Sequence, residues 1–292
     1  MGTGAHSREL AVSDGEFPFT WSDFHQIAQL VHSEAGIVLT ETKANLVYSR
    51  LAKRLRTIGL RSFRDYCALI VGVEGADEHQ AMIAAMTTNV TRFFRESHHF
   101  DYLKKRVLPS LLEAARKGGK VRIWSAGTSS GEEAYSIALT ILDIMPEAAG
   151  LNVRILATDI DPEMLRRGKA GLYQIHQVAE IPAEQRKRWF HPVMQGEDGE
   201  FEVAPALRTL VRFKELNLLY EWPMSGRFDV IFCRNVMIYF DDDTQNEVWS
   251  RFSGVLQPGG ILCIGHSERI SMANHPFELV GQTVYRLRGG RS

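Results

Sequence analysis

Strand-like apolar runs alternate with helical segments along the second two thirds of this 292-residue chain. The apolar runs cover residues 121–126, 153–160, 228–233 and 261–264. Helical patterns cover 132–144 and 242–256, the latter stopped by Pro258, and a further helix is expected to begin at Pro162. Strands that alternate with helices favour a parallel sheet with right-handed crossovers, so the predicted fold class is α/β.

Several other regions depart from this alternation. Residues 1–16 lack periodicity and are predicted to be a disordered tail, whereas 17–88 show only helical spacing, as at Phe24, Ile27 and Val31, and are predicted to form a small helical domain. Residues 89–97 are interpreted as a linker, followed by the α/β domain over 98–292. Within it, 172–214 is expected to be an inserted subdomain with a short antiparallel ribbon and a turn at 197–199, and 277–287 to be a terminal hairpin.

Composition excludes several classes of protein. The net charge of -1 argues against a nucleic-acid binder. Three separated cysteines, Cys67, Cys233 and Cys263, favour neither a disulfide framework nor a metal site. The first twenty residues lack the apolar core of a signal peptide, and no run approaches the roughly 18 apolar residues of a membrane span. The expected protein is cytoplasmic, without membrane insertion.

A glycine-containing turn between the first strand and its helix, Gly127-Thr-Ser-Ser-Gly131-Glu-Glu133, is a candidate cofactor site. Its spacing is not that of a dinucleotide fingerprint, and Glu132 and Glu133 would repel a pyrophosphate. The two carboxylates suit a cation, and S-adenosylmethionine carries a sulfonium and an ammonium group. The competing interpretation is a capping box formed by Ser130 and Glu133, with the acidic residues merely stabilising the helix start.

Polar residues also lie at the ends of the next strands. Asp159 is placed to accept hydrogen bonds from ribose hydroxyls, and Asp161 to cap the helix at Pro162. Asn235 follows the run 228–233, at the edge where open α/β sheets bind ligands. Tyr239 is either a lining residue of a methyl-transfer channel or a packed aromatic side chain.

Taken together, these stretches resemble the CheR family of chemotaxis receptor methyltransferases. The matching segments are Asn89-Val-Thr-Arg-Phe-Phe-Arg95, Ser129 to Ser136, Ala157 to Asp161, Asn217-Leu-Leu219, Phe228 to Phe240 and Gly265-His-Ser-Glu268. The resemblance spans nearly the whole chain from about residue 20, and departs where the family often has proline at Ala134 and alanine or cysteine at Gly127. It implies a Rossmann-like methyltransferase domain with a small all-helical N-terminal domain and an inserted β-subdomain.

The resemblance also implies an activity, methyl transfer from S-adenosylmethionine to glutamate side chains of chemoreceptor cytoplasmic helices, leaving S-adenosylhomocysteine. Arg95 and Tyr239 are the implied catalytic residues, and Arg95 would grip either the cofactor carboxylate or the substrate carboxylate. Glu133 would meet the cationic end of the cofactor and Asp159 its ribose. The implied cofactor-binding set is Asn89, Thr91, Arg95, Gly127, Glu133, Asp159, Asn217, Leu218, Asn235 and Val236.

A basic run without intervening acids lies in the helical domain and includes Arg50, Lys53, Arg54 and Arg56. A solvated helix face is the usual explanation of such a run, and nucleic-acid binding is disfavoured because stacking aromatics are lacking. The resemblance implies docking on the acidic receptor bundle, and leaves open whether the β-subdomain binds a receptor C-terminal peptide. Two alternative functions are a cofactor-binding signalling adaptor without transfer activity and a small-molecule O-methyltransferase.

Overall fold

The computed structural model describes residues 11–13, 15–193, 199–271 and 273–289. It divides into two compact units, one containing residues 1–88 with Tyr239–Asp241 and the other Asn89–Ile238 with 242–292. Residues 89–97, predicted as a linker, therefore belong to the second unit. The predicted turn at 197–199 lies largely outside the described residues, as does most of the predicted tail.

The first unit is built from short helices whose apolar faces form a common core, in which Phe24, Ile27 and Leu55 are buried. Thr20 and Asp23 form a capping box at the start of its first helix, and Gly36, in the left-handed conformation, ends that helix. Contrary to the expectation of a disordered tail and no strands, 11–13 form a strand that pairs with 19–20. The elements are β1 (Ala11–Ser13), β2 (Phe19–Thr20), α1 (Trp21–Ala35), η1 (Glu41–Lys43), α2 (Ala44–Ile58), α3 (Phe63–Val71), η2 (Val73–Gly75) and α4 (Ala76–Met86).

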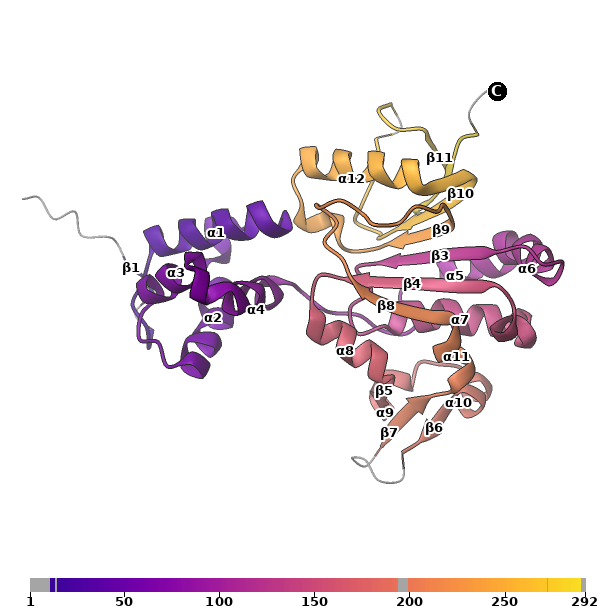
Figure 1. The fold of residues 1–292 in the computed structure, drawn as a ribbon, viewed down its shortest axis with the longest axis horizontal. Helices are drawn as coiled ribbons and strands as arrows, with labels where there is room; N and C mark the ends of the chain where they lie inside the picture. Colours follow the sequence, from indigo (N-terminus) through magenta and orange to yellow (C-terminus); the bar gives the residue numbers. More distant parts are fainter. Residues whose placement is uncertain (1–10, 14, 194–198, 272, 290–292) are drawn as a thin grey trace, which may run out of the picture. The chain divides into compact units, whose positions relative to one another are not determined.

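The second unit is organised around a seven-stranded sheet of order β11-β12-β10-β9-β3-β4-β8, drawn in Figure 1. The five strands from β10 to β8 are parallel, and β11 and β12 add an antiparallel hairpin at one end, as predicted. The strands are β3 (Val121–Ala126), β4 (Val153–Asp159), β8 (Val211–Glu215), β9 (Phe228–Cys233), β10 (Leu256–Ile264), β11 (Phe277–Gly281) and β12 (Val284–Leu287).

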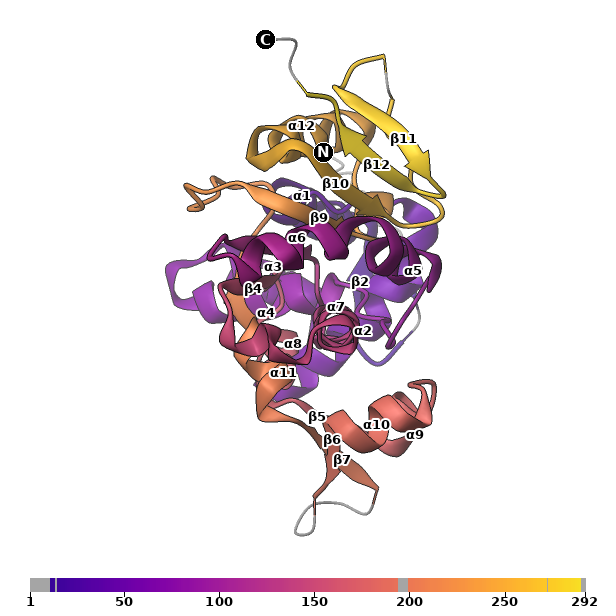
Figure 2. The same ribbon diagram turned by 90° about the vertical axis from the view of Figure 1, so that its right-hand side faces the viewer.

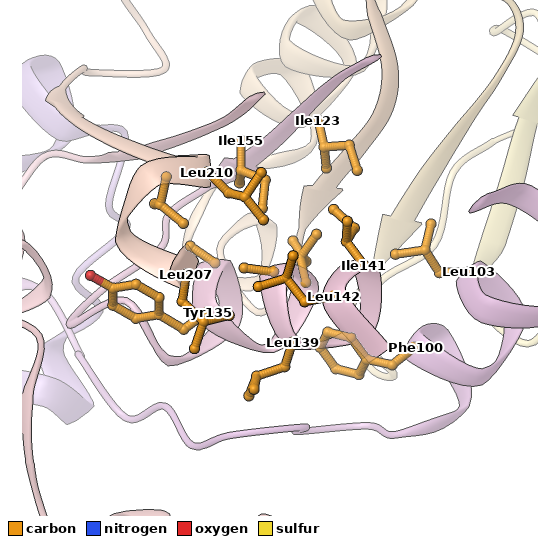
Figure 3. Packing of buried hydrophobic residues seen from close by; sticks show 14 of the residues in the cluster. Phe100, Leu103, Ile123, Tyr135, Leu139, Ile141, Leu142, Ile155, Leu207 and Leu210 are labelled. Atoms are coloured by element: carbon orange, nitrogen blue, oxygen red, sulfur yellow. The ribbon is translucent and has the colours of Figure 1, made fainter. Parts of the chain in front are cut away.

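The helices of this unit pack against both faces of the sheet. Alternate side chains of β3 point to opposite faces: Ile123 belongs to the cluster with α7 shown in Figure 3, whereas Trp124 packs against Phe252 of α12. The helical elements that lie wholly or partly in this unit are α5 (His98–Tyr102), the π-helical turn η3 (Leu103–Val107), α6 (Leu108–Arg116), α7 (Glu132–Ile144), η4 (Pro146–Gly150), α8 (Pro162–Ala170), α9 (Ile175–Val178), α10 (Ala183–Trp189), α11 (Pro205–Leu210), η5 (Met237–Tyr239) and α12 (Asp242–Val255).

A small antiparallel sheet of order β5-β7-β6 lies between α8 and α11 in the sequence. Its strands are β5 (Leu172–Gln174), β6 (Phe190–Pro192) and β7 (Glu200–Val203), and Figure 2 shows them with α9 and α10 beside them, away from the main sheet. This is the predicted inserted subdomain, with three strands in place of a two-stranded ribbon.

Three predicted boundaries need correction. The insert does not extend to 214, because β8 pairs with β4 in the main sheet. The strand predicted over 153–160 ends at Asp159. The strand predicted over 261–264 begins at Leu256, directly after α12, so Pro258 lies within β10 and does not stop a helix. A register shift between Leu256 and Ile261 accommodates Pro258 and its two glycines.

Candidate active site at the carboxyl edge of the sheet

Four parallel strands of the second unit end at one edge of the sheet. Ala126 of β3 is level with Thr158 of β4 and with Cys233 of β9, and Cys233 is level with Ile264 of β10. The segments that follow these strands therefore lie together, as expected for the ligand-binding edge of an α/β sheet. They contain the glycine turn, Asp159, Asn235 and the Gly265–Glu268 segment.

The glycine turn is tied to the neighbouring strand through its backbone. The amides of Gly127 and Thr128 both donate to the carbonyl of Thr158, at 2.8 and 2.9 Å. Gly127 has φ +75°, and a Cβ atom there would lie 2.4 Å from Cγ2 of Val236. Glycine is thus required by both backbone conformation and close approach, and two predicted cofactor-binding residues, Gly127 and Val236, are in contact.

Asp159 is a buried carboxylate at the end of β4. Oδ2 accepts from the amide of Ser129 at 2.7 Å and Oδ1 from that of Asp161 at 3.0 Å. Burial raises the pKa of Asp159 to about 6, although these backbone hydrogen bonds favour the ionised form. Asp161 caps α8 by accepting from the amides of Glu163 and Met164, as predicted, whereas the role of Asp159 in ribose binding stays a prediction.

Glu133 does not take part in the capping box that its spacing allows. The N-cap of α7 is Gly131, without a side-chain cap, and Ser130 donates to Glu132 instead. The Glu133 carboxylate accepts from Ser125 Oγ at 2.6 Å and pairs with Arg234 at 3.1 Å. Burial raises the pKa of Glu133, and the charge of Arg234 opposes this shift.

Arg234 joins two carboxylates beneath the edge of the sheet. Its side chain is buried, pairs with Glu133, lies 3.6 Å from Oε2 of Glu96, donates to the carbonyl of Arg95 and stacks near the ring of Phe100. One guanidinium thus faces two carboxylates. Sequence reasoning quoted Arg234 only as part of a matching stretch, because its partners are distant in the chain.

Glu268 organises the turn that follows β9. Its buried carboxylate accepts from four backbone amides: Asn235 at 3.1 Å, Val236 at 2.9 Å, Met237 at 2.8 Å and Gly265 at 2.5 Å. Sequence reasoning missed this role, although the Gly265–Glu268 segment was among the matching stretches.

Asn235 lies in this turn with φ +60°, and its Oδ1 is buried without a hydrogen-bond partner among the described residues. A buried unpaired carbonyl oxygen is costly unless a ligand or water supplies a donor. This supports the predicted role of Asn235 in ligand binding.

The segment 89–96 passes over the glycine turn and the start of α7. The carbonyl of Asn89 accepts from Ser129 Oγ at 3.2 Å, and its amide group donates to Asp161 at 2.8 Å. Arg95 donates to the carbonyl of Val90 at 2.8 Å. The structure thus brings Asn89 to the site, while the roles of Thr91 and Arg95 stay predictions.

Asn217 and Leu218 follow β8, where the amide of Leu216 donates to the carbonyl of Asp159 at 3.0 Å. Leu218 is buried, and Oδ1 of Asn217 accepts from the amide of Leu219 at 2.9 Å. Arg251 of α12 donates to the carbonyl of Leu218 at 2.7 Å and stacks on Trp222. Arg251 is a further residue that the sequence did not reveal, and it fixes the path of this segment.

The remaining predicted residues belong to the first unit. Tyr239 is half-buried, its carbonyl accepts from the amide of Val38, and its catalytic role stays a prediction. In α2, Arg50 donates to the carbonyls at the end of α4 and Arg54 pairs with Glu78, so both have structural partners. Arg56 pairs with Glu16 at the surface, and Lys53 is exposed.

A possible metal-ligand group also lies near the site. Glu96, His98 and His99 each offer one ligand atom, and these atoms lie within 4.8 Å of one another. However, the Arg234 guanidinium already lies 3.6 Å from Oε2 of Glu96 and would repel a cation. We therefore interpret this group as part of the Arg234 ion-pair network.

The residues at this edge fit S-adenosylmethionine better than a nucleotide phosphate. Glu133 and Glu96 outnumber their shared guanidinium, Asp159 is a buried carboxylate that accepts from backbone amides, and Asn235 retains an unused oxygen. Buried acceptors of this kind suit the ammonium group and the ribose of the cofactor. A pyrophosphate would meet like charges.

Comparison with known proteins agrees with this interpretation. The model of the CheR methyltransferase SAM-binding domain matches residues 89–286, and that of the CheR methyltransferase all-alpha domain matches 22–87. No helix in the described part of the chain is both long and apolar enough to cross a membrane.

Curated proteins that are similar over most of their length are named chemotaxis protein methyltransferases. A probable chemotaxis protein methyltransferase of Rhizobium etli is 51% identical over 88% of this chain and 96% of its own length. The chemotaxis protein methyltransferase of Escherichia coli is 42% identical over 96% of this chain and 93% of its own length. A solved structure of an O-methyltransferase family protein from Burkholderia thailandensis is only distantly similar, with 13% identity and a TM-score of 0.36. The match covers 78% of this chain and 63% of that protein. The chain therefore belongs to the CheR family of S-adenosylmethionine-dependent chemotaxis methyltransferases.

Proposed function

We propose that this methyltransferase esterifies the γ-carboxylates of glutamate residues on the cytoplasmic helical bundle of a chemoreceptor. The observation that carries the proposal is the match of both CheR domains in their family order over nearly the whole chain. The cofactor supplies a methyl group on a positively charged sulfur, and the products are a glutamate methyl ester and S-adenosylhomocysteine.

The chemistry requires positioning more than acid–base catalysis. A glutamate side chain has an ordinary pKa of about 4.3, so it is already ionised at neutral pH and needs no general base. The protein must place the carboxylate oxygen in line with the methyl carbon and the sulfur. Because the attack joins opposite charges, partial exclusion of water favours it.

The residues of the site divide this work. Glu133 would hold the ammonium end of the cofactor and Asp159 its ribose, while Asn217, Leu218 and Asn235 would contact its remaining parts. Arg95 would orient a carboxylate through its planar guanidinium. The Arg234 guanidinium donates to the backbone carbonyl of Arg95 and also pairs with Glu133. The residue that would bind the cofactor and the residue that would bind a carboxylate are therefore both held by Arg234.

Receptor docking would use the exposed charge of the helical unit. Lys53 and Arg56 are the residues of the basic run best placed at the surface, whereas Arg50 and Arg54 are engaged within the unit. The small sheet offers two edge strands, β5 and β6, to which an extended receptor peptide could add.

The experiment is transfer of labelled methyl groups from S-adenosylmethionine to a purified receptor cytoplasmic fragment. We expect incorporation that is released by mild base, as methyl esters are, and lost when the acceptor glutamates of the fragment are replaced by glutamine. Tight cofactor binding without incorporation would instead support a signalling adaptor. Unchanged turnover of a small molecule in the presence of excess fragment would support a small-molecule O-methyltransferase.

A further inference from the structure

His266 follows the last residue of β10 by two positions and stands at the carboxyl edge of the sheet. Its side chain is 62% exposed, yet its position is fixed on one side. Nδ1 lies 2.9 Å from Oε1 of Glu96, and the backbone amide of His266 donates to the same oxygen at 3.3 Å. The partner, Glu96, is only 12% exposed.

This contact determines the tautomer of the ring. An ionised carboxylate only accepts hydrogen bonds, so Nδ1 must carry the hydrogen. In the neutral ring Nε2 then has a lone pair and would repel a carboxylate. In the protonated ring Nε2 becomes a donor, so the imidazolium alone can bind a carboxylate through this atom.

The surroundings keep Glu96 in the form that this arrangement needs. Burial favours the protonated acid, but the hydrogen bond from His266 and the charge of Arg234 outweigh burial and lower the pKa of Glu96. Oε2 lies 3.6 Å from Arg234 and 3.7 Å from Nδ1 of His99. The other titratable groups around this network are His98, whose ring lies tilted against that of His99 with centroids 4.1 Å apart, Glu133, which shares Arg234 with Glu96, and Glu268, which accepts from the amide of Gly265.

The position of His266 relates it to the predicted reaction centre. Gly265 is so close to Asn235 that a Cβ atom at Gly265 would lie 2.7 Å from Nδ2 of Asn235. Glu96, which holds the ring, directly follows Arg95, the predicted carboxylate-binding residue. His266 therefore lies beside both segments that we expect to face the acceptor.

We propose that His266 is a substrate-binding residue whose protonated ring donates from Nε2 to the carboxylate of the acceptor glutamate, with Glu96 as its positioning residue. The inference rests on the proposed function, since it assigns the recognition of that same anionic substrate. Esterification removes the negative charge, so the same contact favours the unmethylated side chain over the product.

The test measures kcat and KM for a receptor cytoplasmic fragment between pH 5.5 and 8.5, with the full-length protein and its His266→Gln and His266→Lys variants. Because only the protonated ring donates from Nε2, the wild-type KM should be lower at the acid end of this pH series than at its alkaline end. His266→Gln should raise KM about tenfold at pH 6, the effect of one charge-assisted hydrogen bond, with little change in kcat. His266→Lys should restore a low KM that no longer depends on pH.

Two controls separate recognition from folding. Calorimetry should show unchanged cofactor affinity in His266→Gln, and His176→Gln, which replaces an exposed histidine of α9, should leave both kinetic constants as in the wild type. This inference alone would be overturned if His266→Gln had the wild-type KM. It would also be overturned if the KM of His266→Lys were as high as that of His266→Gln. Absence of base-labile methylation by the wild-type protein would overturn the proposed function and this inference together.

Discussion

At the carboxyl edge of the seven-stranded sheet charged side chains are buried and have several partners each, whereas along α2 they are partly or fully exposed. Arg234 contacts two carboxylates and a carbonyl, and Glu268 accepts from four amides. Arg56 pairs at the surface with Glu16, and Lys53 is exposed. Buried charges fix local geometry and are weakly screened by salt, whereas exposed charges act on a partner at a distance and are screened strongly.

The largest expected effect tests whether the buried charges at the edge are structural. Arg234→Met leaves Glu133 and Glu96 without their shared cation, and should lower the free energy of unfolding by about 3–5 kcal/mol, measured by urea denaturation. Adding Glu133→Gln to Arg234→Met removes one unpaired charge and should recover part of the loss. If Arg234→Met alone were as stable as the wild type, the buried charges at this edge would not be structural.

An intermediate effect is expected at Asp159, whose carboxylate we place against the cofactor ribose. Its pKa of about 6 means that the carboxyl group gains a proton as the pH falls through 6, and the protonated form offers one acceptor fewer. Cofactor affinity, measured by calorimetry, should be constant above about pH 7 and fall by up to about tenfold as the pH drops through 6, the effect of one lost hydrogen bond.

Asp159→Asn provides the matched control, with weaker binding and no pH dependence in this range. Circular dichroism at each pH would confirm that the protein stays folded. Wild-type affinity that is the same at pH 5 and pH 7 would show that Asp159 does not contact the ligand through its carboxylate.

The smallest effect concerns the exposed face of α2. Lys53→Glu should change the free energy of unfolding by less than about 0.5 kcal/mol, yet raise the KM for a receptor fragment a few-fold at low ionic strength, an effect that salt removes. Lys120→Glu makes the same charge change at the amino edge of the sheet, before β3, and should leave KM unaltered. Equal effects of the two variants would show that net charge, and not a docking face, is responsible.

The sequence predicted those parts of the fold that are determined locally. The bounds of β3 and α7 agree with the structure because an apolar run and a helical pattern meet at a clear glycine turn. β8 was assigned to the insert because it is an edge strand with only Val211 and Phe213 buried, so its pattern resembles that of a surface ribbon. The start of β10 was missed because local Pro and Gly signals were overridden by pairing with β9.

The same distinction holds for the site. Asp159 and Asn235 could be placed at the sheet edge because Asp159 ends one recognisable strand and Asn235 lies two residues beyond another. Arg234 and Glu268 could not be assigned roles, because their partners at Glu133 and at Asn235 lie 101 and 33 residues away in the chain. A charged residue inside a short motif does not reveal whether it faces solvent or serves as the common partner of several distant groups.

The four amides gathered by Glu268 have a consequence for how this turn keeps its shape. The carboxylate grips main-chain atoms at positions 235–237, and these are present whatever side chains occupy those positions. The path of the chain through this turn therefore depends on Glu268 more than on the side chains of the turn itself. A single anionic side chain on a neighbouring strand connection thus holds the main chain of a turn whose own side chains are left unoccupied by that task.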